Sequence, residues 1–179
     1  MKKLFFYLFA GLFMTTVFIS CNRNDDDEET AGNSTGGSAT LTAEQYGFDG
    51  AHSGKFASTK AGIVKTSAAG MTILTISAIR DGGNESINMV LYGDVKVQTY
   101  TLGNGSQNGI VIRKDYQNVT DQAKSYSTDN NGANLTGGGE VKITSVNGNK
   151  IEGTFYAIGF NNARSEAYAE QGKFSGTIN

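Results

Sequence analysis

The sequence predicts an all-β fold, either an antiparallel β-sandwich or a partly closed barrel of about nine to ten short strands. Glycine supplies 24 of the 179 residues and separates short runs that are rich in Val, Ile, Thr, Phe and Tyr. Several of these runs alternate polar and apolar residues with a period of two. No segment after residue 44 has the apolar spacing of an amphipathic helix, so we expect a single β-domain at residues 44–179.

The first 20 residues have the order of features that is typical of a secretory signal peptide. Lys2 and Lys3 precede an apolar run over residues 4–19, and the small residue Ser20 follows it. These 16 residues are fewer than the roughly 20 that a helix needs to cross the hydrocarbon core of a bilayer. We therefore expect residues 1–20 to be a signal peptide rather than a membrane span.

Cys21 is the only cysteine, and it lies at the end of the apolar run. The segment Phe18-Ile19-Ser20-Cys21 resembles the lipobox of bacterial lipoproteins, in which the cysteine is acylated and becomes the first mature residue. Phe18 departs from this motif, which usually has Leu or Val there. The resemblance implies lipid attachment at Cys21 and a membrane as partner. Several acyl chains would anchor the protein firmly, since each buried methylene contributes about 0.8 kcal/mol. The alternative is a buried or accidental cysteine.

Five acidic residues follow the cysteine closely: Asp25, Asp26, Asp27, Glu28 and Glu29. This run resembles the export signal of Bacteroidetes surface lipoproteins, which implies an outer-membrane lipoprotein that is exposed at the cell surface. Asn22 agrees with the outer membrane, because Asp at that position retains lipoproteins in the inner membrane of some bacteria. The alternative is a solvated acidic spacer, with a domain that faces the periplasm.

Residues 21–43 combine the acidic run with a Gly/Ser-rich stretch, and we expect them to form a flexible tether. The whole chain has 15 basic and 17 acidic residues, and the imbalance arises in the leader and the tether. Residues 44–179 carry 12 basic and 12 acidic residues and are neutral. A neutral domain argues against a nucleic-acid partner, because phosphate binding needs a dense Lys/Arg face.

Five runs show strand patterning most clearly. They span residues 71–79, 86–92, 140–146, 150–160 and 172–178. In the second run Ile87, Met89 and Leu91 lie on one face and Asn88 on the other, as in a strand with one buried and one solvated face. The run 71–79 is apolar on both faces, which favours a central strand.

Turn residues separate these runs. Residues 81–84 lie between two of them, and Asn147-Gly148 is the dipeptide that type I′ hairpin turns favour. Gly103-Asn104-Gly105 opens a further loop, and residues 130–132 mark a longer connection. The chain has 0 Pro, so its edge strands need protection by charge, twist or partners.

Three C-terminal segments resemble a family of small, uncharacterised β-rich lipoproteins of Bacteroidetes. They are Gly139-Glu140-Val141-Lys142-Ile143-Thr144, Asn149-Lys150-Ile151-Glu152-Gly153-Thr154-Phe155 and Gly172-Lys173-Phe174. In that family a hairpin ends in a Gly-Thr-Phe strand, and a Gly-Lys-Phe strand follows. Gly54-Lys55-Phe56 and Tyr100-Thr101-Leu102-Gly103 match more loosely, so the resemblance covers residues 46–179. It implies structural motifs and no functional residues, because the family has no assigned activity.

His52 is the single histidine, in the segment 49–54 that we interpret as a loop. Asp49, His52 and Ser53 are the residue types of a hydrolytic triad. A working triad, however, draws its members from separate elements and orients the base between nucleophile and acid. We therefore interpret His52 as a satisfied or exposed loop residue and predict no catalytic residues.

Other candidate sites are weak. Residues 103–109 lack the spacing and the following helix of a phosphate-binding loop. Residues 129–134 offer oxygen ligands but lack the Glu and the residue order of a calcium loop. The carboxylates of a glycoside hydrolase would have to come from scattered residues such as Glu85, Asp94, Asp115, Glu140 and Glu152. We expect no metal and no cofactor.

Seven tyrosines lie beyond the leader, and we expect Tyr116, Tyr126 and Tyr168 at the surface because they fall in or near polar segments. Tyrosine beside Asn-rich loops suits recognition of a glycan or a protein, although strands are also rich in tyrosine for packing reasons alone. Our hypothesis is an outer-membrane-anchored, non-enzymatic β-domain that binds a glycan or a protein. Two alternatives remain open: a structural or accessory subunit of an outer-membrane assembly, and a carboxylate-dependent hydrolase.

Overall fold

The structure is a computed structural model that describes residues 39–179. Ten strands make up almost all of it: β1 (Ala39–Phe48), β2 (Ala51–Ala68), β3 (Met71–Ile79), β4 (Ser86–Tyr92), β5 (Gln98–Gly103), β6 (Gly109–Arg113), β7 (Ser125–Ser127), β8 (Gly138–Asn147), β9 (Lys150–Phe160) and β10 (Glu166–Thr177). A short 3₁₀ helix, η1 (Gln122–Lys124), precedes β7. All strand pairs are antiparallel, so the predicted all-β class is confirmed.

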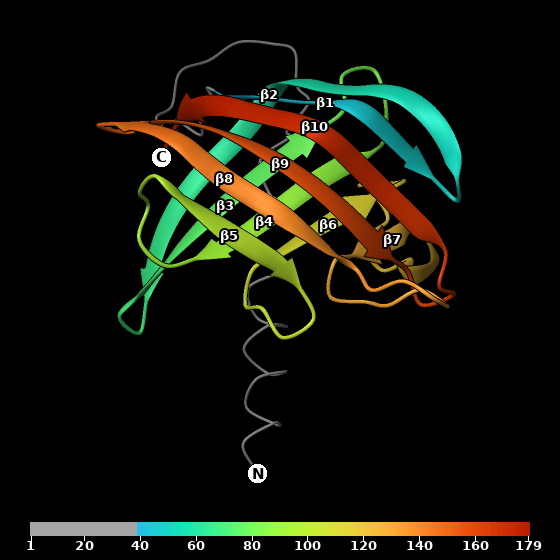
Figure 1. Cartoon of the computed structure of the whole chain (residues 1–179). Helices are drawn as coiled ribbons and strands as arrows, with labels where there is room; N and C mark the ends of the chain where they lie inside the picture. Colours follow the sequence, from blue (N-terminus) through green and yellow to red (C-terminus); the bar gives the residue numbers. More distant parts are fainter. Residues whose placement is uncertain (1–38) are drawn as a thin grey trace. The chain divides into compact units, whose positions relative to one another are not determined.

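Eight of the strands close into a barrel in the order β10-β1-β2-β3-β4-β6-β7-β9, and the pairing of β9 with β10 completes the ring. The seam between β7 and β9 is short, because only Ser127 and Phe160 pair there. Along the rest of that edge β9 pairs with β8, and β5 follows β8 outside the ring. In Figure 1 β5, β8, β9 and β10 cross over β3, β4 and β6, so the domain has two layers. This confirms the predicted sandwich or partly closed barrel.

The observed strands agree with the predicted runs most closely in the middle of the chain. Residues 71–79, 86–92 and 150–160 coincide with β3, β4 and β9, and the run 140–146 lies inside β8. The last strand, β10, begins at Glu166 and not at residue 172. The first strand begins at Ala39 rather than after residue 44, and its Leu41 is fully buried.

Inward-facing side chains fill the space between the two layers. Fully buried members of this core include Leu41, Phe56, Ile63, Leu74, Ile76, Ile87, Met89, Leu91, Ile110 and Ile112. On β3 every second residue from Leu74 to Ala78 is buried, while the residues between them are half-buried. This strand lies between β2 and β4, as predicted, but only one of its faces is covered completely.

Two tight hairpins correct the turn predictions. Asp49 and Gly50 join β1 to β2 with φ values of 55° and 75°, which are typical of a type I′ turn. His52 and Ser53 therefore lie on β2, and the interpretation of residues 49–54 as a loop was wrong. Between β8 and β9 the central residues are Gly148 and Asn149, and only Gly148 has a positive φ, 58°. That geometry fits a type II′ turn, so the type I′ prediction for Asn147-Gly148 was also wrong.

The Gly-Thr-Phe and Gly-Lys-Phe segments pack against each other across β9 and β10. Phe155 pairs with Gly172, and Phe174 pairs with Gly153. A Cβ atom on Gly172 would collide with the Phe155 ring, and one on Gly153 would collide with the Phe174 ring and with the carbonyl oxygen of Lys142. Each ring thus occupies the space that the opposite glycine leaves free. This reciprocal packing explains both segments as core structure.

Candidate functional site

The outer face of the layer formed by β5, β8, β9, β10 and β1 carries a regular array of polar side chains. Strand pairing aligns Thr99, Lys142, Thr154, Lys173 and Thr42 in one row across these strands. Buried residues flank Lys142, Thr154, Lys173 and Thr42 along their own strands, and buried Tyr100 follows Thr99, so the row faces away from the core. The face is therefore polar, and hydroxyl groups alternate with lysines along the row.

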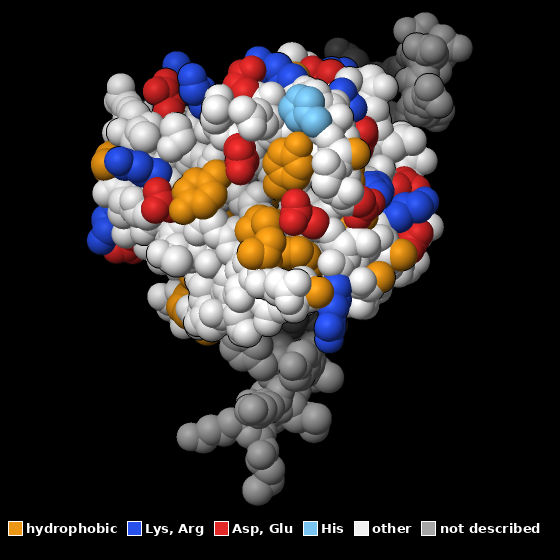
Figure 2. Space-filling model, turned by 45° about the vertical axis from the view of Figure 1, so that its right-hand side comes forward, with side chains coloured by type: hydrophobic (Ala, Val, Ile, Leu, Met, Phe, Trp, Pro, Cys, Tyr) orange, Lys and Arg blue, Asp and Glu red, His pale blue; other side chains and the backbone are white. Residues whose placement is uncertain are grey.

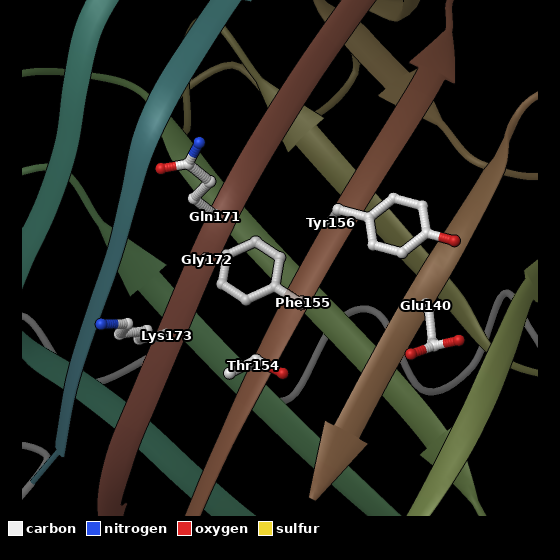
Figure 3. Close-up of a pocket in the computed structure, with 7 residues that line it drawn as sticks. All are labelled: Glu140, Thr154, Phe155, Tyr156, Gln171, Gly172 and Lys173. Atoms are coloured by element: carbon white, nitrogen blue, oxygen red, sulfur yellow. The ribbon is translucent and has the colours of Figure 1, made fainter.

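Two shallow depressions lie on this face, and together we call them the outer groove. The first has a volume of about 230 Å³ and is lined by Glu140, Thr154, Phe155, Tyr156, Gln171, Gly172 and Lys173 (Figure 3). The second has a volume of about 340 Å³ and is lined by Thr40, Thr42, Thr144, Glu152, Gly153, Thr154, Lys173, Phe174 and Ser175. Thr154 and Lys173 line both depressions, which therefore adjoin. Both are open to solvent rather than enclosed.

Tyr156 stands at the edge of the first depression and is 52% exposed. It pairs with Glu140 on β8, and on its other side β10 bulges between Ala169 and Gly172. Gln171 in this bulge has a φ of 51° and also lines the depression. Figure 3 shows the Tyr156 ring on the outside of β9, near the Glu140 carboxylate, with Gln171 and Lys173 on β10. The bulge therefore leaves one face of the depression open beside an aromatic ring.

The floor of the first depression is apolar. Phe155 is only 4% exposed but lines the depression, and its ring lies against Gly172 (Figure 3). Gly172 thus makes room for the Phe155 ring in the core, and it also lets a small part of that apolar ring line the polar outer face. A site with an apolar floor and polar walls is the usual composition of a small-molecule site, although this one is shallower than most.

The charged groups of the outer groove do not neutralise one another. Within residues 39–179 no ion pair includes Glu140, Glu152 or Lys173. Glu140 lies opposite Tyr156, and Glu152 is four residues from Tyr156 along β9, which corresponds to about 13 Å. Paired carboxylates of glycosidases lie roughly 5 to 9.5 Å apart. The two glutamates are thus placed to contact different parts of an extended ligand.

His52 lies at the surface, beside a group of hydrophobic side chains in Figure 2. Its Nδ1 atom is 3.2 Å from the hydroxyl oxygen of Tyr168 on β10. Gly47 makes this contact feasible, because a Cβ there would be 2.9 Å from the Tyr168 ring. Asp49 binds Lys114 instead, with its Oδ2 2.6 Å from Nζ. The structure therefore does not assemble Asp49, His52 and Ser53 into a triad.

The barrel end beneath the β1–β2 turn holds a second cluster of aromatic and charged residues. Lys114 Nζ lies 4.9 Å from the ring centre of Phe48 and 5.5 Å from that of Tyr126. The Arg80 guanidinium lies 5.9 Å from the ring centre of Tyr46 and pairs with Glu85 at 3.1 Å. These cation–π contacts and ion pairs stabilise the end of the core.

Two tyrosines in this cluster are fully or almost fully buried. Tyr126 is 1% exposed, so its prediction as a surface residue was wrong, because its strand β7 pairs with β6 over the core. Tyr46 is 0% exposed, and its hydroxyl has no hydrogen-bond partner among the described residues. Burial raises the pKa of Tyr46 strongly, and the nearby Glu85 carboxylate raises it further.

The remaining candidate carboxylates have local structural partners or lie in connections. Asp115 pairs with Lys124 at 3.4 Å, and the backbone oxygen of Asp94 accepts a hydrogen bond from the Tyr100 hydroxyl at 2.9 Å. In the segment 129–134, the Asn130 amide donates to the carbonyl of Phe160 at 2.9 Å. Over residues 39–179 no group of three or more His, Cys, Asp or Glu side chains is placed to hold a metal ion. Residues 103–109 connect β5 to β6, as predicted.

The predicted targeting residues lie outside the described part of the chain. These are Cys21, the proposed lipid attachment site, and the acidic residues Asp25, Asp26, Asp27, Glu28 and Glu29. Within residues 39–179, no helix combines the length and the hydropathy that a bilayer crossing requires.

Residues 48–176 match a protein family described as a domain of unknown function, DUF6252. The chain belongs to this family. The match confirms that its relatives form an uncharacterised family, and it spans the Gly-Thr-Phe and Gly-Lys-Phe segments. No curated protein and no solved structure was found to match the chain. The DUF6252 domain thus covers the sequence from the end of β1 to the end of β10, including most of the outer groove.

The sequence contained part of the signal for the outer groove. The alternation of polar and apolar residues in the run 150–160 placed Glu152, Thr154 and Tyr156 on the solvated face of their strand, which the structure confirms. What sequence reasoning missed was the bulge between Ala169 and Gly172, which places Gln171 at the groove beside the regularly paired Lys173. Tyr156 was nevertheless not among the tyrosines that we expected at the surface, because those were chosen for their polar sequence neighbours and not for their strand face.

Proposed function

We propose that this domain binds a glycan along the outer groove and has no catalytic role there. The observation that supports this best is the composition of the groove: the half-exposed Tyr156 ring, an apolar floor at Phe155, and hydroxyl, amide, ammonium and carboxylate groups around them. Sugars present apolar ring faces bordered by hydroxyl groups. An aromatic platform with amphipathic character and a set of hydrogen-bonding side chains complements both features.

The openness of the groove favours a polymer over a small free metabolite. Enclosed pockets of about 300–1,000 Å³ bury most of a small ligand. Here two adjoining open depressions share Thr154 and Lys173 and follow β9 and β10. An extended chain of sugars would contact both, with Tyr156 at one end and Glu152 at the other. Lys173, which forms no ion pair with another residue of the described range 39–179, lies between the two glutamates and suits a ligand that offers hydroxyl oxygens along its whole length.

A glycan array tests this proposal. The intact protein should bind a subset of glycans, and Tyr156→Ala should weaken that binding at least about tenfold. Leu135→Ala is a matched control, because Leu135 is 58% exposed and lies in the connection between β7 and β8. Absence of any glycan ligand on a broad array, or equal losses in the two variants, would refute the proposal.

We further propose that the domain is displayed by a lipid on Cys21 at the outer membrane, with surface exposure directed by the residues Asp25–Glu29. The signal-peptide pattern and the lipobox resemblance support this placement. Cys21→Ala should abolish labelling of the protein with radioactive palmitate. Replacement of Asp25–Glu29 by neutral residues should preserve the lipid and remove accessibility to protease added to whole cells. Labelling of the Cys21→Ala variant would contradict the anchor, and unchanged protease accessibility would contradict the export signal.

A further inference from the structure

Arg113 is a nearly buried cation on the outside of the barrel. It ends β6 and pairs with Ser86 on β4 and with Ser125 on β7, within the layer behind β8 and β9 in Figure 1. Ile112 precedes it and points into the core, so Arg113 lies on the opposite, outer face of this layer. The residue is nevertheless only 7% exposed. An arginine on the outer face of a sheet normally extends into water, so this degree of burial requires explanation.

The chain from residue 114 to residue 124 folds back over this region. The Tyr116 amide donates to the carbonyl of Asn84 at 2.8 Å, and the Lys114 amide donates to the carbonyl of Lys124 at 3.0 Å. Ser86 beside Arg113 is only 3% exposed. Arg113 thus lies at the base of a connection that crosses towards the β3–β4 turn.

No described residue compensates the charge of Arg113. Its Nε atom is enclosed and has no hydrogen-bond partner, and no ion pair within residues 39–179 includes the guanidinium. Two carboxylates that are close in sequence to Arg113 or to its cross-strand partner Ser86 are engaged elsewhere, since Asp115 pairs with Lys124 and Glu85 with Arg80. Burial lowers the pKa of Arg113, with no carboxylate to oppose the shift. A buried charge without a partner is costly, and an anion that binds beside it would offset this cost.

The residues paired with Arg113 across the strands supply hydrogen-bond donors rather than carboxylates. Its neighbours across the strands on both sides are serines, whose hydroxyl groups can donate. Ser86 Oγ accepts a hydrogen bond from the Asn88 amide at 3.3 Å, which leaves its own hydroxyl proton free. The guanidinium presents its donors in a planar fork that matches two oxygens of one carboxylate or phosphate group.

We propose that Arg113, flanked by Ser86 and Ser125, binds a single oxoanion of the carboxylate or phosphate type. The ligand oxygens accept hydrogen bonds from the guanidinium, including its Nε–H group, and from the two hydroxyl groups. This site lies on the opposite layer from the outer groove, so it is independent of the proposed glycan binding. It accounts for an arginine that is buried with no counter-charge of its own.

Nuclear magnetic resonance on the full chain in a non-ionic detergent tests the proposal. The signal of the Arg113 Nε–H group is followed during titration with sodium phosphate, with sodium acetate and with sodium chloride at equal ionic strength. We expect a saturable shift with phosphate, acetate or both, and none with chloride. Saturation by phosphate alone assigns a phosphoryl ligand, and saturation by acetate alone assigns a carboxylate. Failure of both oxoanions, or an equal response to chloride, would overturn the site.

Two variants sharpen the result. Arg113→Lys keeps the charge but loses the planar fork, so affinity for the oxoanion should fall about tenfold. Arg164→Gln is the control, because Arg164 is exposed and lies outside the site. In thermal unfolding, the oxoanion should raise the midpoint of the wild-type protein and of Arg164→Gln more than that of Arg113→Lys. Equal effects on all three proteins would contradict the proposal. The titration of the wild-type chain decides the question even if the Arg113 variant does not fold.

Discussion

The β9–β10 pair and the barrel end around Tyr46 bury aromatic rings in opposite ways. On β9 and β10 each phenylalanine ring fills the space above a glycine on the other strand, and no side-chain polar atom of these two described strands is buried without a hydrogen-bond partner. At the barrel end Tyr46, Phe48 and Tyr126 lie beneath Arg80 and Lys114, and the Tyr46 hydroxyl has no partner among the described residues. The first region is packed by shape alone, whereas the second includes a polar atom that packing leaves unsatisfied.

This difference indicates which substitutions each region tolerates. In a region packed by shape, any change of volume destabilises the protein, whether an atom is added or removed. In a region with an unsatisfied hydroxyl group, removal of that group relieves a desolvation cost. The same class of substitution, removal of side-chain atoms from an aromatic residue, should therefore have opposite effects in the two regions.

Phe174→Ala should produce the largest effect. Phe174 is 2% exposed, and its removal leaves a cavity above Gly153 that the backbone cannot fill. We expect a loss of about 3–5 kcal/mol in the free energy of unfolding, measured by urea denaturation. Lys173→Ala, on the exposed face of the same strand, is the control and should change stability by less than about 0.5 kcal/mol. A loss under 1 kcal/mol for Phe174→Ala would show that the Gly–Phe packing is loose.

Gly172→Ala tests the same packing by adding an atom. The new methyl group would collide with the Phe155 ring, and we expect a loss of about 1–3 kcal/mol. The collision is specific to that ring, so Gly172→Ala should cost less in a Phe155→Leu background than in the wild type. A double-mutant cycle of the four proteins measures this coupling. Strictly additive free energies would mean that the cost arises from the backbone and not from the ring.

Much of the fold was predictable because β9 and its neighbours follow a local pattern. Alternation in residues 150–160 identified both the strand and its buried face, and Gly148 marked the hairpin. Most of β2 escaped prediction, apart from the loosely matching Gly54-Lys55-Phe56, because its register with β1 is irregular and extra residues in a strand interrupt the period of two. Tyr126 was misplaced because β7 has only three residues, too few to show a period.

The candidate sites were less predictable than the fold, since they combine residues that are distant in the sequence. The outer groove needs Tyr156 beside Glu140, which the β8–β9 hairpin brings about, and also the bulge in β10. The isolation of Arg113 likewise depends on Glu85 and Asp115 having other partners. The β10 bulge and the isolation of Arg113 have no local signal in the sequence.

Tyr46→Phe should stabilise the protein, in contrast to the substitutions on β9 and β10. The variant removes a buried hydroxyl group without a partner among the described residues and keeps the ring, so we expect a gain of about 1 kcal/mol at neutral pH. Tyr126→Phe is a matched control, because Tyr126 is also buried but its hydroxyl is not among the unsatisfied atoms. A loss of stability in Tyr46→Phe would indicate that a water molecule satisfies the hydroxyl group.

The pH dependence of Tyr46 provides a second measurement. Its pKa in the folded state is raised above the ordinary value of 10.0, so the folded protein keeps a proton that the unfolded chain loses at high pH. The contribution of this shift to the free energy of unfolding is therefore fully present below pH 10. Above pH 10 it decreases by about 1.4 kcal/mol per pH unit. Tyr46→Phe should show a shallower decrease of stability above pH 10 than the wild type. Identical alkaline slopes would mean that Tyr46 ionises in the folded protein as it does in water.

Tyr156→Ala should have the smallest effect on stability and thereby separate binding from folding. The side chain is 52% exposed, on the outer face of the strand whose inner face carries Phe155. Its removal should change the free energy of unfolding by less than about 0.5 kcal/mol, against the several kcal/mol expected for Phe174→Ala. A loss of more than 1 kcal/mol would show that Tyr156 supports the β10 bulge, and a loss of glycan binding would then report on structure rather than contact. If stability is unchanged, a loss of glycan binding in Tyr156→Ala reports on direct contact between the glycan and the Tyr156 ring.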